Sequence, residues 1–490
     1  MMRGLYSRGL SSFVIGALAS LSAHRSPAAE RPSIIRGPYL QSLLDTSVVV
    51  MFTTSEPLAA ALTWGVEGGP DSTVAGGNPT TEHRFRLEGL APGKIHRYSI
   101  HTGLLPLTQG FTFRTSPPTG AGGIRVAVIG DSGSGSAAQL AVAGVMEEMA
   151  PDFILHVGDI DYEDDMDLTF FRPYQRLLAR SCIFPAQGNH DIFLPWPSLF
   201  VLPGLDPKRR GIYYSFDWGS AHFAVLDTER DLFEEPEQLD WLAADLEAAR
   251  ARAIPWLILS FHRPLFTIGA YAFDEATIRG RVAIGPIADR YGVDLILSGH
   301  DHNYQRSHPV RGAGVRDAWQ DPRFDSPRGT VNLVTGGGGT DFLYQKSAGA
   351  DERFTRRFIS IQHAVEVDIK VSEIHVRVVS HEKQLIDEFR ITKAPRRPGP
   401  RLVRGDVDFD GALSITDGIG ILLHLFQGLR IDCPEAARIE AAGGFLSITD
   451  AVYLLNYLFL GGPPPRAPFP ECAPALGGDD AWCVREACGG

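Results

Sequence analysis

Five short apolar runs in this chain each end in residues that can bind a metal ion, and this arrangement limits the folds it can adopt. The runs end in Asp131 (VAVIGDSG), Asp159 and Tyr162 (LHVGDIDY), Asn189 and His190 (PAQGNHD), His262 (LILSFHRP), and His300 and His302 (LILSGHDH). Asp131, Asp159 and Asn189 follow one another at intervals of 28 and 30 residues, the length of one strand-helix-strand unit. Ligands of open α/β sheets bind outside the carboxyl ends of the strands. The spacing therefore predicts that these three side chains share one sheet edge.

A glycine precedes the polar residues in four of the five clusters, at Gly130, Gly158, Gly188 and Gly299. Glycine lets the backbone turn sharply where a strand ends and lets it approach an ion closely. One Gly-Asp turn alone is more often a plain turn than a site. Five clusters in chain order, all at strand ends and all with metal-binding chemistry, favour one shared metal site.

The pattern of predicted strands and helices changes twice along the 490 residues, which indicates about three domains. Residues 33–116 are short strands punctuated by Gly and Pro, the pattern of a β-sandwich, and a Gly/Pro-rich linker follows. Residues 124–393 alternate strands with helical segments and become all-β toward their end, which predicts a sheet with helices on both faces. A Pro/Arg linker at 394–403 then leads to a separate small module at 404–490.

The N-terminus has the order of a secretory signal: Arg3 and Arg8, an apolar stretch at 13–23, and small residues up to Ala29. We expect residues 1–29 to be a signal peptide and the protein to be secreted, periplasmic or on the cell surface; the alternative is the start of a buried helix. The apolar stretch is too short to span a bilayer, so we expect no transmembrane segment in the mature chain. The formal net charge of −12 argues against a nucleic-acid partner.

The cysteines divide between the middle of the chain and its C-terminal module. Four lie close to the C-terminus: Cys433, Cys472, Cys483 and Cys488. In an exported chain they could form two disulfides, and three connectivities are open. Cys182 stands alone, and we expect it to be a buried free thiol.

The set of clusters resembles that of the metallophosphoesterases. Its motifs are GDxG, GDxxY, GNHD, a single histidine after a strand, and GHxH, and Tyr162 makes it similar to the purple acid phosphatases. Many relatives have a histidine where this chain has Gly133, and Tyr162 is expected to supply the missing ligand. The resemblance covers residues 124–393. It implies a four-layer αββα core within a multidomain protein of mixed α+β and α/β class.

The same resemblance implies a binuclear metal site. It assigns Asp131, Tyr162 and His302 to one metal, Asn189, His262 and His300 to the other, and Asp159 as the bridge. Phenolate and carboxylate are hard donors that suit Fe³⁺, whereas an amide oxygen with two imidazoles suits Zn²⁺, Mn²⁺ or Fe²⁺. A tyrosinate bound to Fe³⁺ would give the colour of the purple acid phosphatases. Asp301, between the two final histidines, is expected to be a spacer.

The expected reaction is hydrolysis of phosphomonoesters by an exported phosphatase through a metal-activated hydroxide. His190 matches a histidine that faces the substrate, and we assign it transition-state hydrogen bonding or protonation of the leaving group; orientation of a ligand is the alternative. Arg263 and Arg306 are candidates for phosphate binding, or else structural salt-bridge partners. The loops at 268–280 and 315–327 are expected to select the substrate.

Other features of the catalytic region receive plainer interpretations. His222 and His363 lie within strand patterns and are interpreted as satisfied strand histidines. The glycine run at 335–340 lacks the lysine and helix of a nucleotide loop, so we expect a close backbone approach near the site. The β-sandwich resembles a fibronectin type III domain, with His96 where its corner tyrosine is expected, and the purple acid phosphatase family also carries a β-sandwich there.

The C-terminal module begins with a calcium-loop pattern. Its expected ligands are Asp406, Asp408, Asp410, the carbonyl of Ala412, and Asp417, with Gly411 at the sharp turn. An acidic solvated turn is the alternative. With the amphipathic helix that follows, the loop resembles a dockerin repeat, which implies Ca²⁺ and a protein or cell-surface partner.

A second copy of the repeat keeps the LSITD motif and the helix. It has Ile439, Ala441 and Gly443 in place of the first aspartates, so we expect it to lack calcium.

Two other functions remain open from the sequence. A phosphodiesterase or nucleotide-cleaving enzyme could use the same metals. Alternatively, the β-sandwich and the calcium module could make this an adhesion protein with a vestigial site, although every predicted ligand position is intact.

Overall fold

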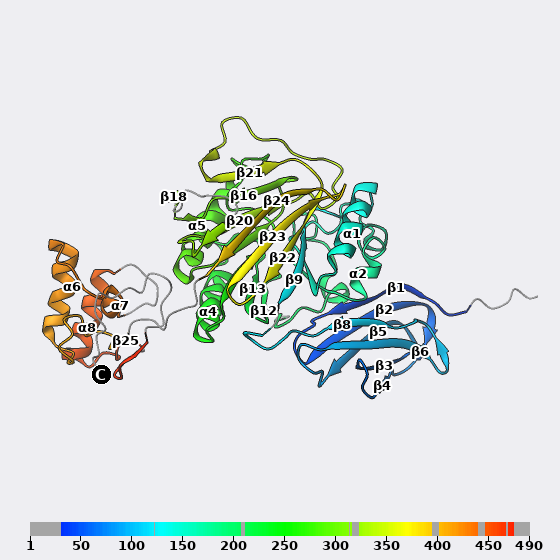
Figure 1. Ribbon diagram of the computed structural model, residues 1–490, viewed down its shortest axis with the longest axis horizontal. Helices are drawn as coiled ribbons and strands as arrows, with labels where there is room; N and C mark the ends of the chain where they lie inside the picture. The colour runs from blue at the N-terminus through cyan, green and yellow to red at the C-terminus, as the bar shows by residue number, and fades with distance from the viewer. Residues whose placement is uncertain are drawn as a thin grey trace, which may run out of the picture.

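The computed structural model of the protein describes residues 31–121, 123–206, 211–312, 314–315, 323–393, 401–439, 446–466 and 469–474. Along the chain follow an N-terminal β domain, a central domain built on two large sheets, and a small helical module (Figure 1). The predicted signal peptide at 1–29 lies outside the described residues, as does most of the predicted linker. In the described parts of the chain, no helix is both long enough and apolar enough to cross a bilayer.

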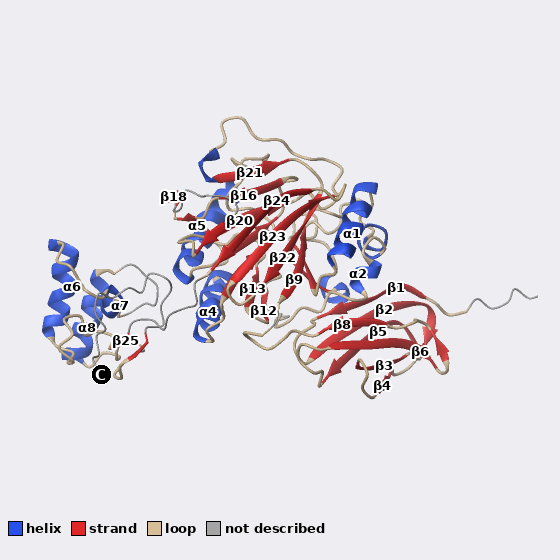
Figure 2. Ribbon diagram, in the orientation of Figure 1, coloured by secondary structure: helices blue, strands red, loops and turns tan. Residues whose placement is uncertain are grey.

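The N-terminal domain consists of two antiparallel sheets (Figure 2). One contains β1 (Ile34–Gln41), β2 (Ser47–Leu58) and β5 (Thr80–Glu88); the other contains β3 (Ala61–Val66), β4 (Ser72–Ala75), β6 (Ile95–Thr102), β7 (Leu105–Pro106) and β8 (Phe111–Arg114). In β5 buried and exposed side chains alternate, as expected for a strand with one face on a core. His96 bonds through Nε2 to the carbonyl of Ala91, 3.1 Å away, much as a corner tyrosine bonds backbone a few residues upstream. Kinship with fibronectin type III stays a prediction.

The central domain contains two seven-stranded sheets. The first runs β11 (Cys182–Pro185), β10 (Phe153–His156), β9 (Ile124–Ile129), β22 (His363–Ile369), β23 (Glu373–Ser380), β24 (Leu385–Thr392), β19 (Arg323–Asp325). The second runs β12 (Tyr214–Trp218), β13 (Ala221–Val225), β14 (Trp256–Ser260), β15 (Leu295–Ser298), β20 (Val331–Thr335), β16 (Tyr304–Ser307), β21 (Thr355–Ile359). Strands β9, β10 and β11 are mutually parallel, as are β13, β14, β15 and β20. The connecting elements are α1 (Ala137–Met149), η1 (Asp167–Phe171), α2 (Gln175–Leu178), α3 (Trp196–Leu199), α4 (Glu237–Ala251), α5 (Glu275–Tyr291), β17 (Val310–Arg311), β18 (Gly314–Val315) and η2 (Glu352–Phe354).

Aromatic side chains join the two sheets face to face. Phe184 of β11 stacks on Phe216 of β12 with ring centroids 3.8 Å apart, and Phe153 of β10 meets Phe223 of β13 edge-on at 5.3 Å. Burial of each ring contributes about 1.5–3 kcal/mol. Helix α1 contacts the first sheet, whereas α4 and α5 share an apolar cluster with β14 and β15 of the second. The layers therefore run helix, sheet, sheet, helix.

The C-terminal module contains two equivalent helices, α6 (Ile415–Gln427) and α8 (Ile448–Leu460), with the short α7 (Pro434–Ala437) between them and a pairing of β25 (Arg401–Leu402) with β26 (Ala473–Pro474). Both long helices begin with a capping box, formed by Ser414 with Asp417 and by Ser447 with Asp450. Each box satisfies two backbone amides at a helix start. The internal repeat read from the sequence thus forms two copies of one helical unit.

The cysteines of the described residues have the expected states. Cys433 and Cys472 are disulfide-bonded, whereas Cys182 is free and buried. Burial raises the pKa of the Cys182 thiol to about 12, so this cysteine stays protonated and unreactive. Cys483 and Cys488 lie outside the described residues.

The two strand histidines are satisfied inside the fold. His363 bonds to Thr335 (3.0 Å) and to the carbonyl of Ile361 (2.8 Å), and burial lowers its pKa to about 4. His222 lies between two carboxylates, with Nδ1 2.7 Å from Asp217 and Nε2 2.8 Å from Asp245. Both ring nitrogens can donate only when the imidazole is protonated. Burial lowers the pKa of His222, but its bonds to the two carboxylates outweigh this and raise the pKa above its ordinary value.

We expect His222 to make stability depend on pH. Because its folded-state pKa is raised, its contribution is fully present below about pH 6.5, the unfolded-state pKa, and is lost as the pH rises through the folded-state pKa. His222→Gln should therefore lower the free energy of unfolding by about 2 kcal/mol at pH 6 and by less at pH 9. Urea unfolding followed by tryptophan fluorescence measures this. His363→Gln is the control with the opposite pH dependence: because burial lowers the folded-state pKa of His363 to about 4, its contribution to stability falls as the pH drops below about 6.5, and this variant should lose less stability at pH 6 than at pH 9. A loss for His222→Gln that does not decrease from pH 6 to pH 9 would contradict the assignment.

Candidate metal centre

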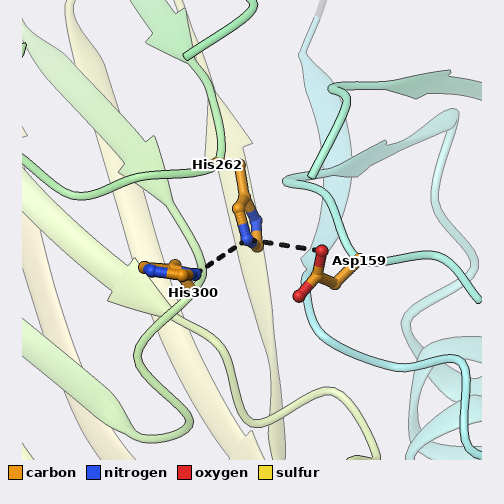
Figure 3. A group of neighbouring side chains, drawn as sticks. All are labelled: Asp159, His262 and His300. Atoms are coloured by element: carbon orange, nitrogen blue, oxygen red, sulfur yellow. Dashed lines mark hydrogen bonds and ion pairs between the residues drawn. The ribbon is translucent and has the colours of Figure 1, made fainter. Parts of the chain in front are cut away.

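The five clusters converge where the two sheets face each other. Asp131, Asp159 and Asn189 follow the parallel neighbours β9, β10 and β11, so they share one sheet edge, as the spacing predicts. His262 and His300 follow β14 and β15 of the opposite sheet. Figure 3 shows the two histidines beside Asp159, with His262 between His300 and the carboxylate. The centre is therefore built from two sheets: the edge predicted from the spacing holds Asp131, Asp159 and Asn189, and the facing sheet supplies the histidines.

One group of ligand atoms gathers around the hydroxyl of Tyr162. Ligand atoms of Asp131, Asp159 and His302 lie within 4.8 Å of one another, and all three residues are buried. The Tyr162 oxygen lies 3.3 Å from Asp131 Oδ1, 3.1 Å from Asp159 Oδ2 and 3.3 Å from His302 Nε2. Two carboxylates, a phenol and an imidazole thus face a common point.

A second group lies on the other side of Asp159. Ligand atoms of Asp159, His262 and His300 also lie within 4.8 Å of one another. His262 Nε2 is 3.1 Å from Asn189 Oδ1, 3.1 Å from His300 Nδ1 and 3.4 Å from Asp159 Oδ1. Asp159 is the only residue common to both groups of the described chain, and its two oxygens point to different groups.

Contacts outside the centre fix which nitrogen each histidine presents. His262 Nδ1 bonds to the carbonyl of Val157 at 2.9 Å, and His302 Nδ1 to the carbonyl of Phe342 at 2.8 Å. Both therefore present Nε2 to the centre. His300 is turned the other way, because its Nε2 lies 3.0 Å from Arg263 Nη1. The carbonyls that accept the Nδ1–H of His262 and His302 fix the tautomer that leaves Nε2 free for a metal ion. Arg263 can only donate to His300 Nε2, so it orients this ring without fixing a metal-binding tautomer.

Three of the central residues have left-handed backbone conformations. The φ angles are 57° for Asp131, 55° for Asp159 and 67° for His300, which costs about 1–3 kcal/mol for each residue other than glycine. Hydrogen bonds hold this conformation: the amide of Asp131 donates to the carbonyl of Gly158 (2.9 Å), and the amide of His300 to Asp131 Oδ2 (2.9 Å). Strain at these positions is typical of functional sites.

The glycines of the motifs are required by close packing. A Cβ at Gly188 would collide with Asp159, and one at Gly133 would collide with the carbonyl of Ile160. No side chain fits at residue 133, so a histidine ligand cannot stand there. This agrees with the expectation that Tyr162 supplies that ligand instead. The glycine run also approaches the centre closely, since the amide of Gly338 donates to the carbonyl of Gly130 at 2.9 Å.

The buried carboxylates of the centre need a positive charge nearby to compensate them. Burial raises the pKa of Asp131. Burial also acts to raise the pKa of Asp159, but His262 outweighs it, and the result lies well below the ordinary value. For His262 burial acts to lower the pKa, yet Asp159 and Asp131 raise it to about 10. In the protein alone, a proton on His262 thus compensates the carboxylates. This donor set fits metal ions, which would replace that proton.

His190 and the two arginines have different surroundings. His190 is exposed; its amide donates to Asp159 Oδ1 at 3.0 Å, and its ring lies edge-on to Tyr162 with centroids 4.6 Å apart. Arg263 is held by Glu229 at 2.8 Å and lies against His300. Arg306 is only 1% exposed and is bound to Asp387 at 2.8 and 3.0 Å. Because this guanidinium already holds a buried carboxylate, the structure favours the structural salt-bridge alternative for Arg306.

Asp301 is not a spacer. Its buried carboxylate accepts hydrogen bonds from the hydroxyl of Thr267 and from the amide of Ala270, the latter at 2.8 Å. This holds the loop that carries Tyr271, whose ring stacks on His300 with centroids 3.7 Å apart. Tyr344 stacks in the same way on His302, at 4.3 Å. Reasoning from sequence missed these contacts, although Tyr271 lies in a loop expected to select the substrate.

Asp191, the last residue of the GNHD motif, joins two of the ligand loops. Its carboxylate is fully buried and accepts the amides of Ile160 and Gly188, each at 2.8 Å. Burial, together with the charge of Asp159, raises the pKa of Asp191 to about 7. The residue fixes the loop after β10 relative to the loop after β11.

The calcium-loop residues gather at the start of α6. Ligand atoms of Asp406, Asp408 and Asp417 lie within 4.8 Å of one another. Asp417 Oδ1 accepts the amide of Val407 at 2.7 Å, and Asp406 Oδ1 is buried without a hydrogen-bond partner in the described chain. Asp410 instead accepts the amide of Ala412 at 2.8 Å and lies outside that group.

The second copy of the loop holds its backbone in the same way, without the aspartates. The amide of Ile439 donates to Asp450 Oδ1 at 2.8 Å, which is the equivalent of the bond from Val407 to Asp417 in the first copy. Ala441 and Gly443 lie outside the described residues.

Comparison with known proteins relates this geometry to phosphoesterases. Residues 124–304 match the family model of the calcineurin-like phosphoesterases. Acid phosphatase type 7 of Homo sapiens is 29% identical over 301 residues, 56% of this chain and 65% of that protein. A protein of Arabidopsis thaliana named probable inactive purple acid phosphatase 1 is 28% identical over 315 residues, 56% of this chain and 51% of its own. The chain thus spans about half to two-thirds of the length of these relatives.

A solved structure shares the fold. The purple acid phosphatase PPD1 from yellow lupin (Lupinus luteus) seeds has a TM-score of 0.65 at 19% identity, covering 73% of this chain and 75% of the lupin chain. At that level of identity the likeness shows the fold alone.

We expect the centre to depend on the missing side chain at residue 188. Gly188→Ala would push its Cβ into Asp159 and should lower the amount of tightly bound divalent metal, measured by elemental analysis, by at least about tenfold. Gly144→Ala is the matched control, because nothing lies within 4 Å of a Cβ there and alanine favours a helix interior by about 0.5–1 kcal/mol. Equal metal content in the two variants would show that metal binding does not depend on the position of Asp159.

Proposed function

We propose that this chain, which contains a calcineurin-like metallophosphoesterase domain, is a binuclear-metal phosphatase of the purple acid phosphatase type that hydrolyses phosphomonoesters. One observation carries the proposal: Asp159 belongs to two groups of ligand atoms, one of which includes the Tyr162 hydroxyl. A carboxylate shared in this way can bridge two metal ions, and such pairs activate phosphate esters.

The ligand sets of the proposal follow the two groups. Asp131, Tyr162 and His302 would hold one ion, which we propose to be Fe³⁺. Asn189, His262 and His300 would hold a second, Zn²⁺, Mn²⁺ or Fe²⁺, with Asp159 between them. The contacts of Tyr162 with Asp131 and His302, and of His262 with Asn189 and His300, support this division.

The residues of the chain have distinct parts in the proposed reaction. Two bound metal ions would supply Lewis acidity and lower the pKa of a water molecule. His190 would give a proton to the leaving oxygen or hydrogen-bond the phosphoryl group, and its exposed ring beside Tyr162 and its amide bond to Asp159 support this role. Arg263 holds His300 in orientation and is the remaining candidate for contact with phosphate.

Activity itself is part of the proposal, since an Arabidopsis relative carries the word inactive in its name. All seven predicted ligand positions of this chain hold a residue that can bind metal. This supports an enzyme over the alternative of an adhesion protein with a vestigial site. A phosphodiesterase that uses the same ions is the rival activity.

The surrounding modules extend the proposal. The bonded state of Cys433 and Cys472 supports export to an oxidising compartment. The group of Asp406, Asp408 and Asp417 supports one Ca²⁺ in the C-terminal module, with Asp410 and Ala412 completing the predicted loop. That a protein or cell-surface partner docks on this module is implied only by its resemblance to a dockerin.

The protein loaded with iron and zinc should hydrolyse p-nitrophenyl phosphate faster than bis(p-nitrophenyl) phosphate and absorb in the visible. Asp159→Ala should lose both ions and all activity above the buffer blank. His302→Ala and His300→Ala should each retain about one of the two ions, from opposite sites. Metal analysis and initial rates measure these outcomes.

Tyr162→Phe is the conservative control, since it removes only the hydroxyl. It should lose the visible band while the fold stays intact by circular dichroism. Hydrolysis by Asp159→Ala at the wild-type rate would refute the proposal, and faster cleavage of the diester would favour the rival activity.

Calcium should bind the C-terminal module at one site. Asp406→Asn should weaken Ca²⁺ binding, measured by calorimetry, by at least about tenfold, because it removes a charged ligand. Asp450→Asn removes a carboxylate from the second copy, at the position equivalent to Asp417, and should leave calcium binding unaltered. Loss of binding in both variants would show that the calcium assignment is wrong.

A further inference from the structure

A cavity of about 530 Å³ lies next to the metal centre. Its walls come from the loop that follows β13, residues 228–233, and from the start of α5, residues 274–280, with Arg263 between them. This volume lies within the range of about 300–1,000 Å³ that is usual for small-molecule sites. Residues 274–280 fall within the loop 268–280 that the sequence analysis expects to select the substrate, whereas residues 228–233 have no role assigned from the sequence.

Arg263 connects the cavity to the centre. The arginine lines the cavity, and its Nη1 lies 3.0 Å from Nε2 of His300, a proposed metal ligand. On the cavity side it contacts Glu229 at 2.8 Å and Asp274 at 3.7 Å. The loop from Tyr271, which stacks on His300, runs to Asp274 in the cavity wall. A phosphate ester bound at the metals would therefore have the cavity within reach of its leaving group.

The arginines of the cavity are already neutralised. Arg263 is paired with Glu229, Arg230 with Glu235, and Arg279 with Asp231. The cavity also holds the carboxylates of Asp274 and Glu275. Such a wall disfavours a leaving group that carries a negative charge.

Glu229 offers a vacant acceptor. Its side chain is only 3% exposed. Oε2 accepts both donors of Arg263, whereas Oε1 is buried and has no hydrogen-bond partner among the described residues. An unsatisfied buried carboxylate oxygen costs about 1–3 kcal/mol. Because Glu229 lines the cavity, a donor group of a bound molecule that reached Oε1 would remove that cost.

Phe233 gives the same cavity an apolar surface. Its side chain is 49% exposed, and the guanidinium of Arg279 lies 5.0 Å from its ring centroid. A half-exposed ring beside hydrogen-bond acceptors suits a molecule with C–H faces and several donors.

We propose that this cavity binds the leaving group of the phosphate ester and selects leaving groups that carry hydroxyl or ammonium donors and no negative charge. The inference rests on the proposed phosphatase function and specifies its substrate class. Glu229 accepts a donor of the leaving group, and Phe233 packs against its carbon skeleton.

The test compares kcat/KM for glucose 6-phosphate, phosphoethanolamine and 3-phosphoglycerate, with p-nitrophenyl phosphate as the reference for the centre itself. The wild type should prefer the first two to 3-phosphoglycerate by at least about tenfold. The first substrate tests hydroxyl donors and the second an ammonium donor. Glu229→Gln should reduce this preference at least about fivefold, mainly through KM, because it removes an acceptor for the leaving group.

Glu237→Gln is the matched control: it makes the same change of charge at an exposed position outside the cavity and should keep the wild-type preference. If Glu229→Gln does not fold, Phe233→Ala tests the same cavity and should lower kcat/KM for glucose 6-phosphate relative to 3-phosphoglycerate. Hydrolysis of p-nitrophenyl phosphate with no preference among the three substrates would overturn the cavity assignment alone. No hydrolysis of any ester by protein loaded with two metals would overturn the proposed function itself.

Discussion

The structure of the candidate centre depends on the position of one carboxylate, that of Asp159. It is 2% exposed, lies 3.1 Å from the Tyr162 hydroxyl and 3.4 Å from His262 Nε2, and accepts the amide of His190 at 3.0 Å. A buried negative charge is costly unless it is paired. Here the compensating groups come from both sheets, so the charge of Asp159 can be accommodated only when the two sheets are packed together.

That packing has a cost which the rest of the domain offsets. Asp131, Asp159 and His300 adopt left-handed backbone conformations, and neighbouring glycines approach so closely that a Cβ would collide. Burial of the rings that meet between the sheets, such as Phe184 and Phe216, contributes about 1.5–3 kcal/mol each, which is enough to offset the strain of these turns. Core packing away from the centre therefore allows the turns to persist, and their rigidity keeps the ligand atoms in two separate groups.

The arginines show that the surroundings of a charged residue decide its role. Arg263 and Arg306 both follow a proposed ligand closely in the sequence. Arg306 is buried against Asp387 and Phe389, whereas Arg263 lies between His300 and a cavity. The role of the Asp301 carboxylate is likewise decided by its surroundings, because it accepts the amide of Ala270 and so positions the loop of Tyr271. These roles depend on residues more than 30 positions away, which no local pattern reports.

The sequence by itself determined which side chains leave the ends of strands, because the alternation of apolar runs and glycine-polar turns is a local property of the backbone. It predicted the shared edge of Asp131, Asp159 and Asn189, the repeated helical unit and the buried thiol of Cys182, whereas the layered core with two sheets was implied only by the family resemblance. Only the tertiary structure decided that His262 and His300 approach from a second sheet, that His300 presents Nδ1, and that Asp301 and Tyr271 support it. The physical reason is that such contacts join residues far apart in the chain, and they are set by how the two sheets pack rather than by the periodicity of either one.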